Sequence, residues 1–341
     1  MGEVARRVET ARNVNEFRCP MSTIPRRLFL AGSAVALSTT GCTWLEKVNP
    51  FAGKSPNGTP LEQRPAEQFT KYLNDQASVL DGVAYEEVSV TVGMGALIDP
   101  DLTATIDCAK PRSFRMKANH GLQSGQLDVG SNDKQFWMYV RHGNPKYVFA
   151  SHDDLSSGRA RLPVPFDPDW VFMALGMSGV DASSNPTVEL DANRRQYVLT
   201  TMARTPQGIA VKKLTCFAGD DQTGTSPQVK WHAVVDARTN KEIAMTDIRK
   251  VKRMEVRNPR TGEMTIVALP TEMRLIFSGP DNQKLKLDMT LRREKVNPAF
   301  TAEQTAYLFT MPPISGATPV NLAGGGWQQG TPNARGQMGR K

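Results

Sequence analysis

Histidine, cysteine and acidic side chains are the residues of this 341-residue chain that could do chemistry. The histidines do not form the His-x-x-x-His or His-x-His spacing that places two imidazoles on one metal ion; they are His120, His142, His152 and His232. The acidic runs 152–154 and 219–221 are better explained as exposed loops than as cation sites. Neither a Gly-x-Ser-x-Gly turn nor a phosphate-binding loop occurs. The sequence therefore predicts no catalytic residue, no metal and no cofactor.

The composition indicates a folded protein with a modest positive charge. The formal net charge is +8, and hydrophobic residues make up 39% of the chain, enough for a real core. Four Cys are too few for a disulfide-stapled miniprotein. The densest basic run, 249–253, lacks the interleaved aromatic residues that nucleic acid would need, so we expect no nucleic-acid partner. It could face anionic lipid, although a solvated strand edge explains it better.

Residues 26–42 have the order of a secretory signal: a basic pair, about ten weakly apolar residues, then small residues and a Cys. Arg26 and Arg27, followed by Leu-Phe-Leu, resemble a twin-arginine export signal. The small residues before Cys42 resemble a bacterial lipobox, in which the Cys becomes a lipidated N-terminus. The alternative is a buried helix with a chance Cys. We expect export and lipidation at Cys42.

These features divide the chain into four parts. Residues 1–41 are expected to be a signal peptide, with 1–20 upstream of a second possible start at Met21. Residues 42–59 are rich in Pro, Gly, Asn and Lys, which predicts a flexible tether. Residues 60–313 should form the folded domain, and residues 314–341 a disordered Gly- and Pro-rich tail.

The folded domain is predicted to be mainly β. One helix is expected over 61–79, and a short one over 168–175 with Asp167 as its N-cap and Gly176 as its stop. From residue 82 onward apolar residues recur at every second position, as in half-buried strands. Strands are expected around 88–92, 102–108, 112–118, 124–130, 134–141, 145–150, 195–204, 208–217, 229–235, 242–251, 273–277 and 285–291. Short turns between them indicate antiparallel hairpins. Such strands can close into a barrel, pack as a sandwich or curl around a helix, and the early helix favours a curled sheet with helices over its mouth.

Residues 111–149 resemble the LolA/LolB family of periplasmic lipoprotein carriers and receptors. They contain Pro-Arg-Ser-Phe-Arg at 111–115, a turn-like stretch at 125–132 and Phe-Trp-Met-Tyr at 136–139. Further similar segments are Asp-Ala-Arg-Thr-Asn at 236–240, and 296–300 with 309–312. The resemblance covers about residues 60–313. It implies an unclosed barrel of antiparallel strands, capped by helices, with a cavity for acyl chains. The expected lipid anchor is closer to the receptor-type members than to the soluble carriers.

An acyl-chain cavity would need apolar walls and an adaptable cover. The candidate wall residues are Val90, Val92, Phe114, Met116, Trp137, Tyr139, Trp231, Met273, Phe277, Leu287 and Met289. The candidate lid residues are Phe69, Leu73, Trp170, Phe172 and Met173. For any one of these residues an ordinary filled core is the simpler explanation. Cys108 and Cys216 either form a disulfide in an oxidising compartment or remain buried thiols.

The leading hypothesis is a non-enzymatic, membrane-tethered lipoprotein of a bacterial cell envelope, facing the periplasm. It would bind acyl chains or lipoproteins in an apolar cavity and act as a receptor in lipoprotein or lipid localisation, as a monomer, with a carrier protein as a further candidate partner. The alternative is a structural or interaction lipoprotein with a filled core and a protein-binding surface. An envelope enzyme with scattered acidic residues ranks last.

Overall fold

The computed structural model describes residues 61–94, 97–121, 123–141, 146–160, 168–205, 208–219, 228–278 and 284–324. All of them belong to one of the chain's two compact units, residues 53–341. The predicted export signal with Arg26 and Arg27, the lipidation site Cys42 and the tether lie outside the described residues. So does the predicted N-cap Asp167.

The described part is dominated by strands. They are β1 Gly82–Met94, β2 Leu97–Ala109, β3 Ser113–His120, β4 Gln123–Ser131, β5 Gln135–Val140, β6 Lys146–Ser151, β7 Thr187–Asp191, β8 Gln196–Arg204, β9 Ala210–Ala218, β10 Val229–Asp236, β11 Glu242–Arg257, β12 Met264–Ser278, β13 Lys284–Val296 and β14 Val320–Asn321. The helices are α2 Ala66–Val79, α3 His152–Ser156, α4 Pro168–Ala174 and α5 Ala302–Leu308, with short 3₁₀ turns η1 Ala182–Ser184 and η3 Leu322–Gly324.

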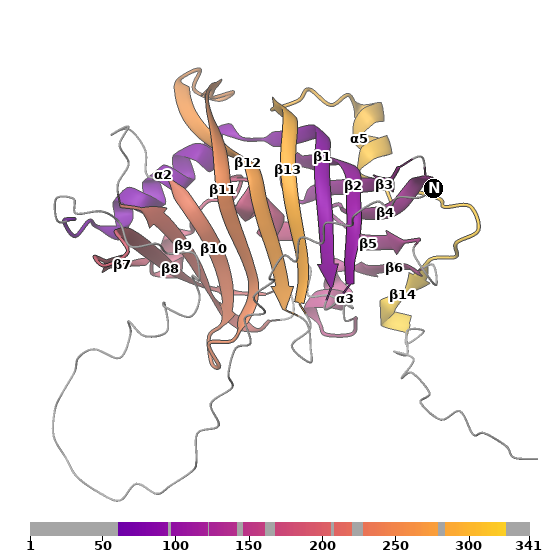
Figure 1. Cartoon of the computed structure of the whole chain (residues 1–341), viewed down its shortest axis with the longest axis horizontal. Coiled ribbons are helices and arrows are strands. Elements are labelled where there is room, and N and C mark those ends of the chain that lie inside the picture. The colour runs from indigo at the N-terminus through magenta and orange to yellow at the C-terminus, as the bar shows by residue number, and fades with distance from the viewer. Residues whose placement is uncertain are drawn as a thin grey trace, which may run out of the picture. The chain divides into compact units, whose positions relative to one another are not determined.

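All these strands form one 14-stranded sheet in the order β14-β6-β5-β4-β3-β2-β1-β13-β12-β11-β10-β9-β8-β7. Two antiparallel meanders, β1–β6 and β7–β13, are joined by the pairing of β1 with β13, and only β14 pairs in parallel, with β6. The sheet curls so that its two ends turn behind the central strands (Figure 1). The end strands β7 and β14 do not pair with each other. The predicted fold class, a mainly β protein whose curled antiparallel sheet forms an unclosed barrel with helices over its mouth, is confirmed.

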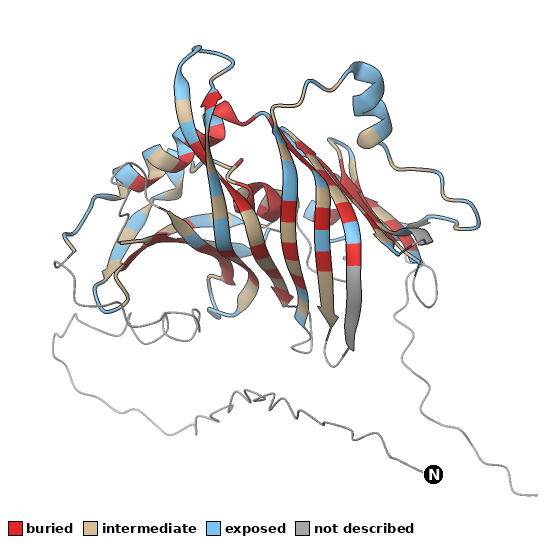
Figure 2. Cartoon of the chain, turned by 45° about the horizontal axis from the view of Figure 1, so that its top comes forward, coloured by how far each residue is buried: buried red, intermediate tan, exposed pale blue. Residues whose placement is uncertain are grey.

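The sheet has two unlike faces. Val90 lies opposite Met289, and Met289 opposite Met273, so these side chains share one face. We call it the inner face; α2 and α4 pack against it. On the outer face Arg274 pairs with Asp288 at 2.7 Å. Buried residues alternate with exposed ones along the central strands (Figure 2), as expected where one face is covered and the other is hydrated.

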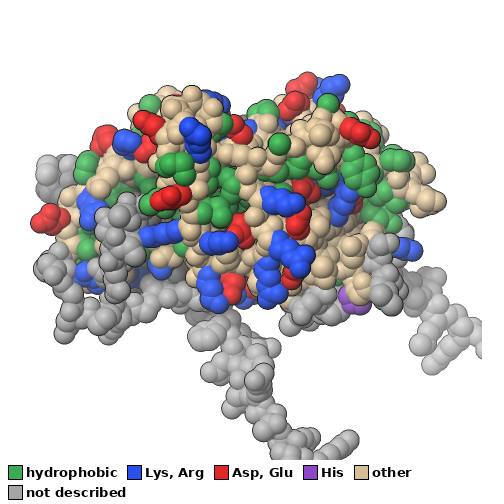
Figure 3. Space-filling model, turned by 90° about the horizontal axis from the view of Figure 1, so that it is seen from above, with side chains coloured by type: hydrophobic (Ala, Val, Ile, Leu, Met, Phe, Trp, Pro, Cys, Tyr) green, Lys and Arg blue, Asp and Glu red, His purple; other side chains and the backbone are tan. Residues whose placement is uncertain are grey.

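The basic run 249–253 lies within β11, where Arg249, Lys250 and Lys252 are exposed. β10 pairs with β11 only over residues 242–247, whereas β12 continues beside β11 to Arg257, so the run lies at an open strand edge, as expected. Arg249 contacts Asp288 at 2.9 Å, and Lys250 contacts Glu272 at 2.5 Å. Figure 3 shows basic and acidic side chains interspersed rather than segregated. Pairing within the sheet therefore explains the charges of this run.

Helix α2 begins five residues later than the sequence predicted. Pro65 has an extended backbone (φ −71°, ψ 149°) and is the N-cap residue, and a residue before proline avoids the helical conformation. Phe69 and Leu73 lie on its buried face, one turn apart. The Phe69 ring packs 5.1 Å from Tyr197 and 4.8 Å from Phe217, so α2 covers the β8–β9 end of the inner face.

Helix α4, which the sequence predicted, covers the middle of the inner face. Gly176 follows it with φ +72°, a left-handed conformation that glycine adopts without steric cost. The Met177 N–H donates to Phe172 O at 2.8 Å and the Gly176 N–H to Met173 O at 3.1 Å, which is a Schellman cap. The predicted stop at Gly176 thus has a specific physical cause.

The segment after α5 packs on the outer face. Met311, Ile314 and Ala317 pack against Trp137, and Val320 pairs with Val148 of β6. The predicted disordered tail, 314–341, therefore starts too early: residues up to 324 belong to the folded part, because aromatic side chains on the outer face of β5 need a cover.

Candidate functional site

The inner face collects most of the predicted cavity walls. They lie in or against a single buried cluster: Val90, Val92, Phe114, Met116, Met273, Phe277, Leu287 and Met289. Register explains why, because Val92 lies opposite Leu287, and Leu287 opposite Leu275. The face is apolar from β6 through β1 to β12.

Three predicted wall residues lie on the outer face instead. Trp137 lies opposite Gly130, which lies opposite the outer-face residue Arg115. Tyr139 belongs to the Trp137 cluster, and Trp231 lies opposite Asp247, the register partner of Arg274. Both faces of β5 and β10 are largely buried, so alternation alone could not assign a side.

The predicted lid residues belong to two different covers. Trp170 stacks on Phe277 with ring centroids 5.9 Å apart and an interplanar angle of 18°. Phe172 is buried in the same cluster, and Met173 packs against it. Phe69 and Leu73 of α2 join Tyr197, Leu199 and Phe217 in a separate cluster. The predicted walls in the middle of the sheet are thus covered by α4, while α2 covers one end.

One buried amide ties the two covers to the sheet. Gln76 of α2 accepts a hydrogen bond from Ala268 N–H at 3.1 Å and donates to Ala268 O at 3.3 Å. Its Nε2 also lies 3.5 Å from Gly176 O, directly after α4. A Cβ at Gly176 would lie 1.7 Å from that nitrogen, so glycine is needed there for a steric reason as well. Together with Asn74, which exchanges two hydrogen bonds with the Val180 backbone, Gln76 links α2 to the segment that follows α4.

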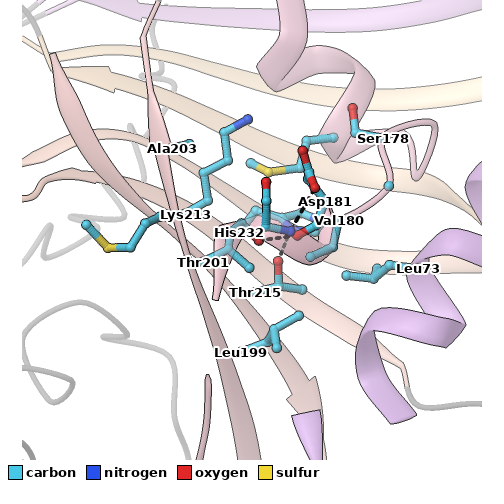
Figure 4. Close-up of a pocket in the computed structure, with 15 residues that line it drawn as sticks. Leu73, Ser178, Val180, Asp181, Leu199, Thr201, Ala203, Lys213, Thr215 and His232 are labelled. Atoms are coloured by element: carbon cyan, nitrogen blue, oxygen red, sulfur yellow. Dashed lines mark hydrogen bonds between the residues drawn. The ribbon is translucent and has the colours of Figure 1, made fainter. Parts of the chain in front are cut away.

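A pocket of about 330 Å³ adjoins α4, between α2, the segment 178–184 and strands β8–β10. Leu73, Met173 and Leu199 form an apolar part of its wall. Its polar wall comprises Ser178, Asp181, Ser183, Ser184, Thr201, Lys213, Thr215 and His232. In Figure 4 Thr201, Thr215 and His232 lie close to Asp181 of the 178–184 segment, and the Lys213 side chain extends away from them along the pocket. Of the predicted site residues only Leu73 and Met173 line this pocket.

His232 is the most deeply buried polar residue of the pocket, with 3% of its surface exposed. Its Nδ1 lies 3.0 Å from Thr215 Oγ1. Burial, with a smaller contribution from the nearby Lys213 ammonium, lowers the pKa of His232 from 6.5 to about 4. The imidazole is therefore neutral at pH 7.

Sequence reasoning missed this polar group. Lys213 and Thr215 alternate with Leu214 and Cys216, which looks like an ordinary hydrated strand face. Only the register shows that Thr215, His232 and Thr246 lie side by side on three strands. The one available signal was a His in a strand whose neighbours are all apolar.

The two cysteines of the described part are the remaining residues with reactive side chains. Cys108 and Cys216 are free, buried thiols, so the possible disulfide is excluded. They sit on β2 and β9, far apart in the strand order. Burial raises the pKa of both thiols. Among the described residues no three His, Cys, Asp or Glu side chains group to hold a metal ion, and no helix there has the length and hydropathy to cross a bilayer.

Comparison with known proteins gives structural likenesses only. No family model and no curated protein matches the chain. It is similar to a LolA superfamily protein from Nitrosomonas europaea, at 11% identity over 73% of this chain and 99% of that one, with a TM-score of 0.38. It is also similar to a putative outer membrane lipoprotein-sorting protein domain from Vibrio parahaemolyticus, at 8% identity over 71% of this chain and 97% of that one, with a TM-score of 0.45. A third similar structure is a DUF1329 family protein from Desulfovibrio piger, at 11% identity over 72% of this chain and 98% of that one, with a TM-score of 0.38. Likenesses at this level assign neither a family nor an activity to this chain.

Proposed function

We propose that this chain is a non-enzymatic, lipid-anchored protein of a bacterial cell envelope that binds acyl chains on its inner face. The observation that carries the proposal is the cover of that face. A broad apolar surface is closed at its centre by the seven-residue α4, whose polar links to α2 run through two amides, Gln76 and Asn74, to the segment that follows it. A short helix with few attachments can leave a surface that a second sheet or a long helix could not.

Magnitudes favour an exchange of α4 for an acyl chain. Burial of Trp170, Val171 and Phe172 contributes roughly 2–3 kcal/mol for each side chain. An acyl chain contributes about 0.8 kcal/mol for each buried methylene, so roughly ten methylenes match the three side chains. A lipid tail can therefore replace α4 on the inner face at little net cost, and receptor-like binding and release both become accessible.

Binding is tested with the full chain carrying Cys42→Ser, stripped of lipid and titrated with the fluorescent fatty acid cis-parinaric acid. We expect saturable uptake. Gln76→Ala removes the link between α2, β12 and the end of α4, so uptake should become several-fold faster. Gln68→Ala, on the exposed side of the same helix, should leave the rate unchanged. If the chain that carries only Cys42→Ser shows no saturable uptake of cis-parinaric acid, the proposal is overturned.

A filled core with a protein-binding outer surface remains the second candidate. It is favoured by the same burial, since Phe114, Met273 and Phe277 each have at most 2% of their surface exposed with α4 in place. The titration separates the two candidates, because a permanently filled core takes up no acyl probe.

The anchor is tested by cell fractionation. We expect the wild-type chain to sediment with membranes and Cys42→Ser to be released into the soluble fraction, because the expected acyl groups on Cys42 are the proposed attachment. Ser at position 38, also upstream of the described domain, offers a matched control as Ser38→Ala. If the Cys42→Ser variant fractionates as wild type does, lipidation at this position is excluded as the anchor.

A further inference from the structure

A row of buried polar side chains crosses the otherwise apolar inner face. Thr215 lies opposite His232, and His232 lies opposite Thr246, so the row runs over β9, β10 and β11. Thr201 of β8 continues it beside Lys213. Between 3% and 8% of the surface of Thr201, Thr215, His232 and Thr246 is exposed. Buried polar groups are costly unless they are satisfied, so a row of them in an apolar face needs a reason.

The pocket supplies a reason for one end of the row. Thr201, Lys213, Thr215 and His232 all line it (Figure 4). Within the described residues the His232 ring has one hydrogen bond, through Nδ1, and its Nε2 has none. When Thr215 donates to Nδ1, the neutral imidazole carries its proton on Nε2 and can donate it to a ligand.

Lys213 is the cation of this pocket. It is half-buried, and within the described residues its ammonium has no ion pair and no hydrogen bond. The nearby acid, Asp181, is exposed, and its Oδ1 already accepts the Ser183 N–H at 2.8 Å. An anionic ligand would therefore find an unpaired ammonium and a neutral imidazole donor on one wall.

The pocket also has an apolar part that leads toward α4. Leu73 and Leu199 line it, and Met173 lines it while also packing against the main cluster of the inner face. A volume of about 330 Å³ is at the lower end for small-molecule sites, enough for a polar head and a short length of chain. The site is shaped for a molecule with one charged end and one apolar end.

We propose that this pocket binds the anionic head group, a carboxylate or a phosphate, of a single-chain amphiphile whose tail enters the inner face beneath α4. The head would accept hydrogen bonds from Lys213 Nζ and His232 Nε2, with Thr201 as a further donor. This inference rests on the proposed acyl-chain binding and narrows it to ligands with a free anionic end.

The test uses three ligands with the same sixteen-carbon tail and different heads: hexadecanoate, hexadecyl phosphate and hexadecanol. Their dissociation constants are measured by competition with cis-parinaric acid at pH 7.5, on the lipid-free full chain carrying Cys42→Ser. We expect at least one of the two anions to bind about tenfold more tightly than hexadecanol, since hydrogen bonds to charged groups are the stronger ones. Whichever anion is preferred identifies the source of the head group.

Variants of Lys213 locate the effect. Lys213→Met should reduce the preference for the anion over hexadecanol to about twofold or less, without changing the dissociation constant of hexadecanol. Lys213→Arg should retain the tenfold preference. Lys212→Met is the matched control: Lys212 points to the outer face, where its Nζ contacts Asn240 Oδ1 at 3.0 Å, so the preference should persist.

The outcomes are distinguishable. Equal binding of all three ligands by the wild type, or equal effects of Lys212→Met and Lys213→Met, would overturn the head-group site and leave acyl-chain binding standing. If Lys213→Met fails to fold, Thr201→Val must weaken the preference for the anion, and an unchanged preference there overturns the inference. Failure of every ligand to displace or replace the probe would overturn both proposals.

Discussion

Replacing Asp128 by Ala is expected to lower the free energy of unfolding by about 3–5 kcal/mol, because a buried charge loses its partner. Asp128 Oδ2 accepts from Arg115 Nη2 at 2.7 Å, and its Oδ1 accepts from Arg115 Nε at 3.2 Å. The same Oδ1 accepts from Trp137 Nε1 at 3.0 Å. The substitution would leave both a guanidinium and an indole N–H without this acceptor in a nearly dry place.

The effect should spread to the C-terminal segment. Arg115 Nη1 donates to Tyr307 O at 2.8 Å and to Leu308 O at 3.0 Å, and Asn132 Nδ2 donates to Phe309 O at 2.9 Å. A guanidinium that is no longer fixed by Asp128 holds these carbonyls less well. Amide hydrogen exchange in residues 307–317 should therefore become faster than in the central strands.

Asp75→Ala is the matched control. Asp75 pairs with Lys71 at 2.6 Å one turn away on α2, with half of its side chain exposed. Such a surface pair is worth under about 1 kcal/mol. Denaturant unfolding of both variants measures the difference. A loss for Asp128→Ala no larger than for Asp75→Ala would show that the buried network does not hold the outer face together.

Strand periodicity was enough to predict the sheet because most of its strands are hydrated on one side. β13 is the plainest case: Leu287, Met289 and Leu291 alternate with Asp288 and Thr290, and the structure buries the first three on the inner face. Turn residues fixed the hairpins, as between β11 and β12, where Pro-Arg-Thr-Gly at 259–262 separates the strands. Local chemistry thus determines much of this fold.

The same rule could not place side chains where both faces are covered. Phe136 packs on the inner face and Trp137 under the C-terminal segment. The sequence Phe-Trp-Met-Tyr contains no charged residue that would show which of its side chains point to which face of the sheet. The cover itself comes from residues 311–317, far along the chain. Knowledge of that long-range packing is needed before Trp137 can be assigned to a face.

The polar pocket is unpredictable from the sequence for a related reason. Lys213, Thr215 and His232 are separated by up to 19 residues, and they meet only because β9 pairs with β10 in one register. A shift by one residue would turn Lys213 to the outer face and Lys212 inward. A site that depends on register leaves no motif in the chain.

Acidification should destabilise the protein through His232, by about 3 kcal/mol between pH 6.5 and pH 4. Burial and Lys213 lower the pKa of this imidazole to about 4 in the folded state, against 6.5 in an unfolded chain. Above pH 6.5 neither state is protonated at this ring, so it contributes no pH dependence. As the pH falls below 6.5 this histidine is protonated in the unfolded chain but stays neutral in the folded one. The free energy of unfolding therefore falls by about 1.4 kcal/mol per pH unit.

The measurement is urea unfolding of the wild type and of His232→Asn at pH 7.5, 6.5, 5.5 and 4.5. The variant should be less stable at pH 7.5, because it loses packing and the Thr215 contact at 3.0 Å, but its stability should fall less steeply on acidification. The difference between the two proteins should therefore narrow as the pH drops. His120→Asn, at an exposed position, controls for the loss of a histidine as such. A difference that stays constant over this range would mean that His232 takes up its proton as readily in the folded protein as in the unfolded chain, and therefore that the pocket is wetter and more open than its packing indicates.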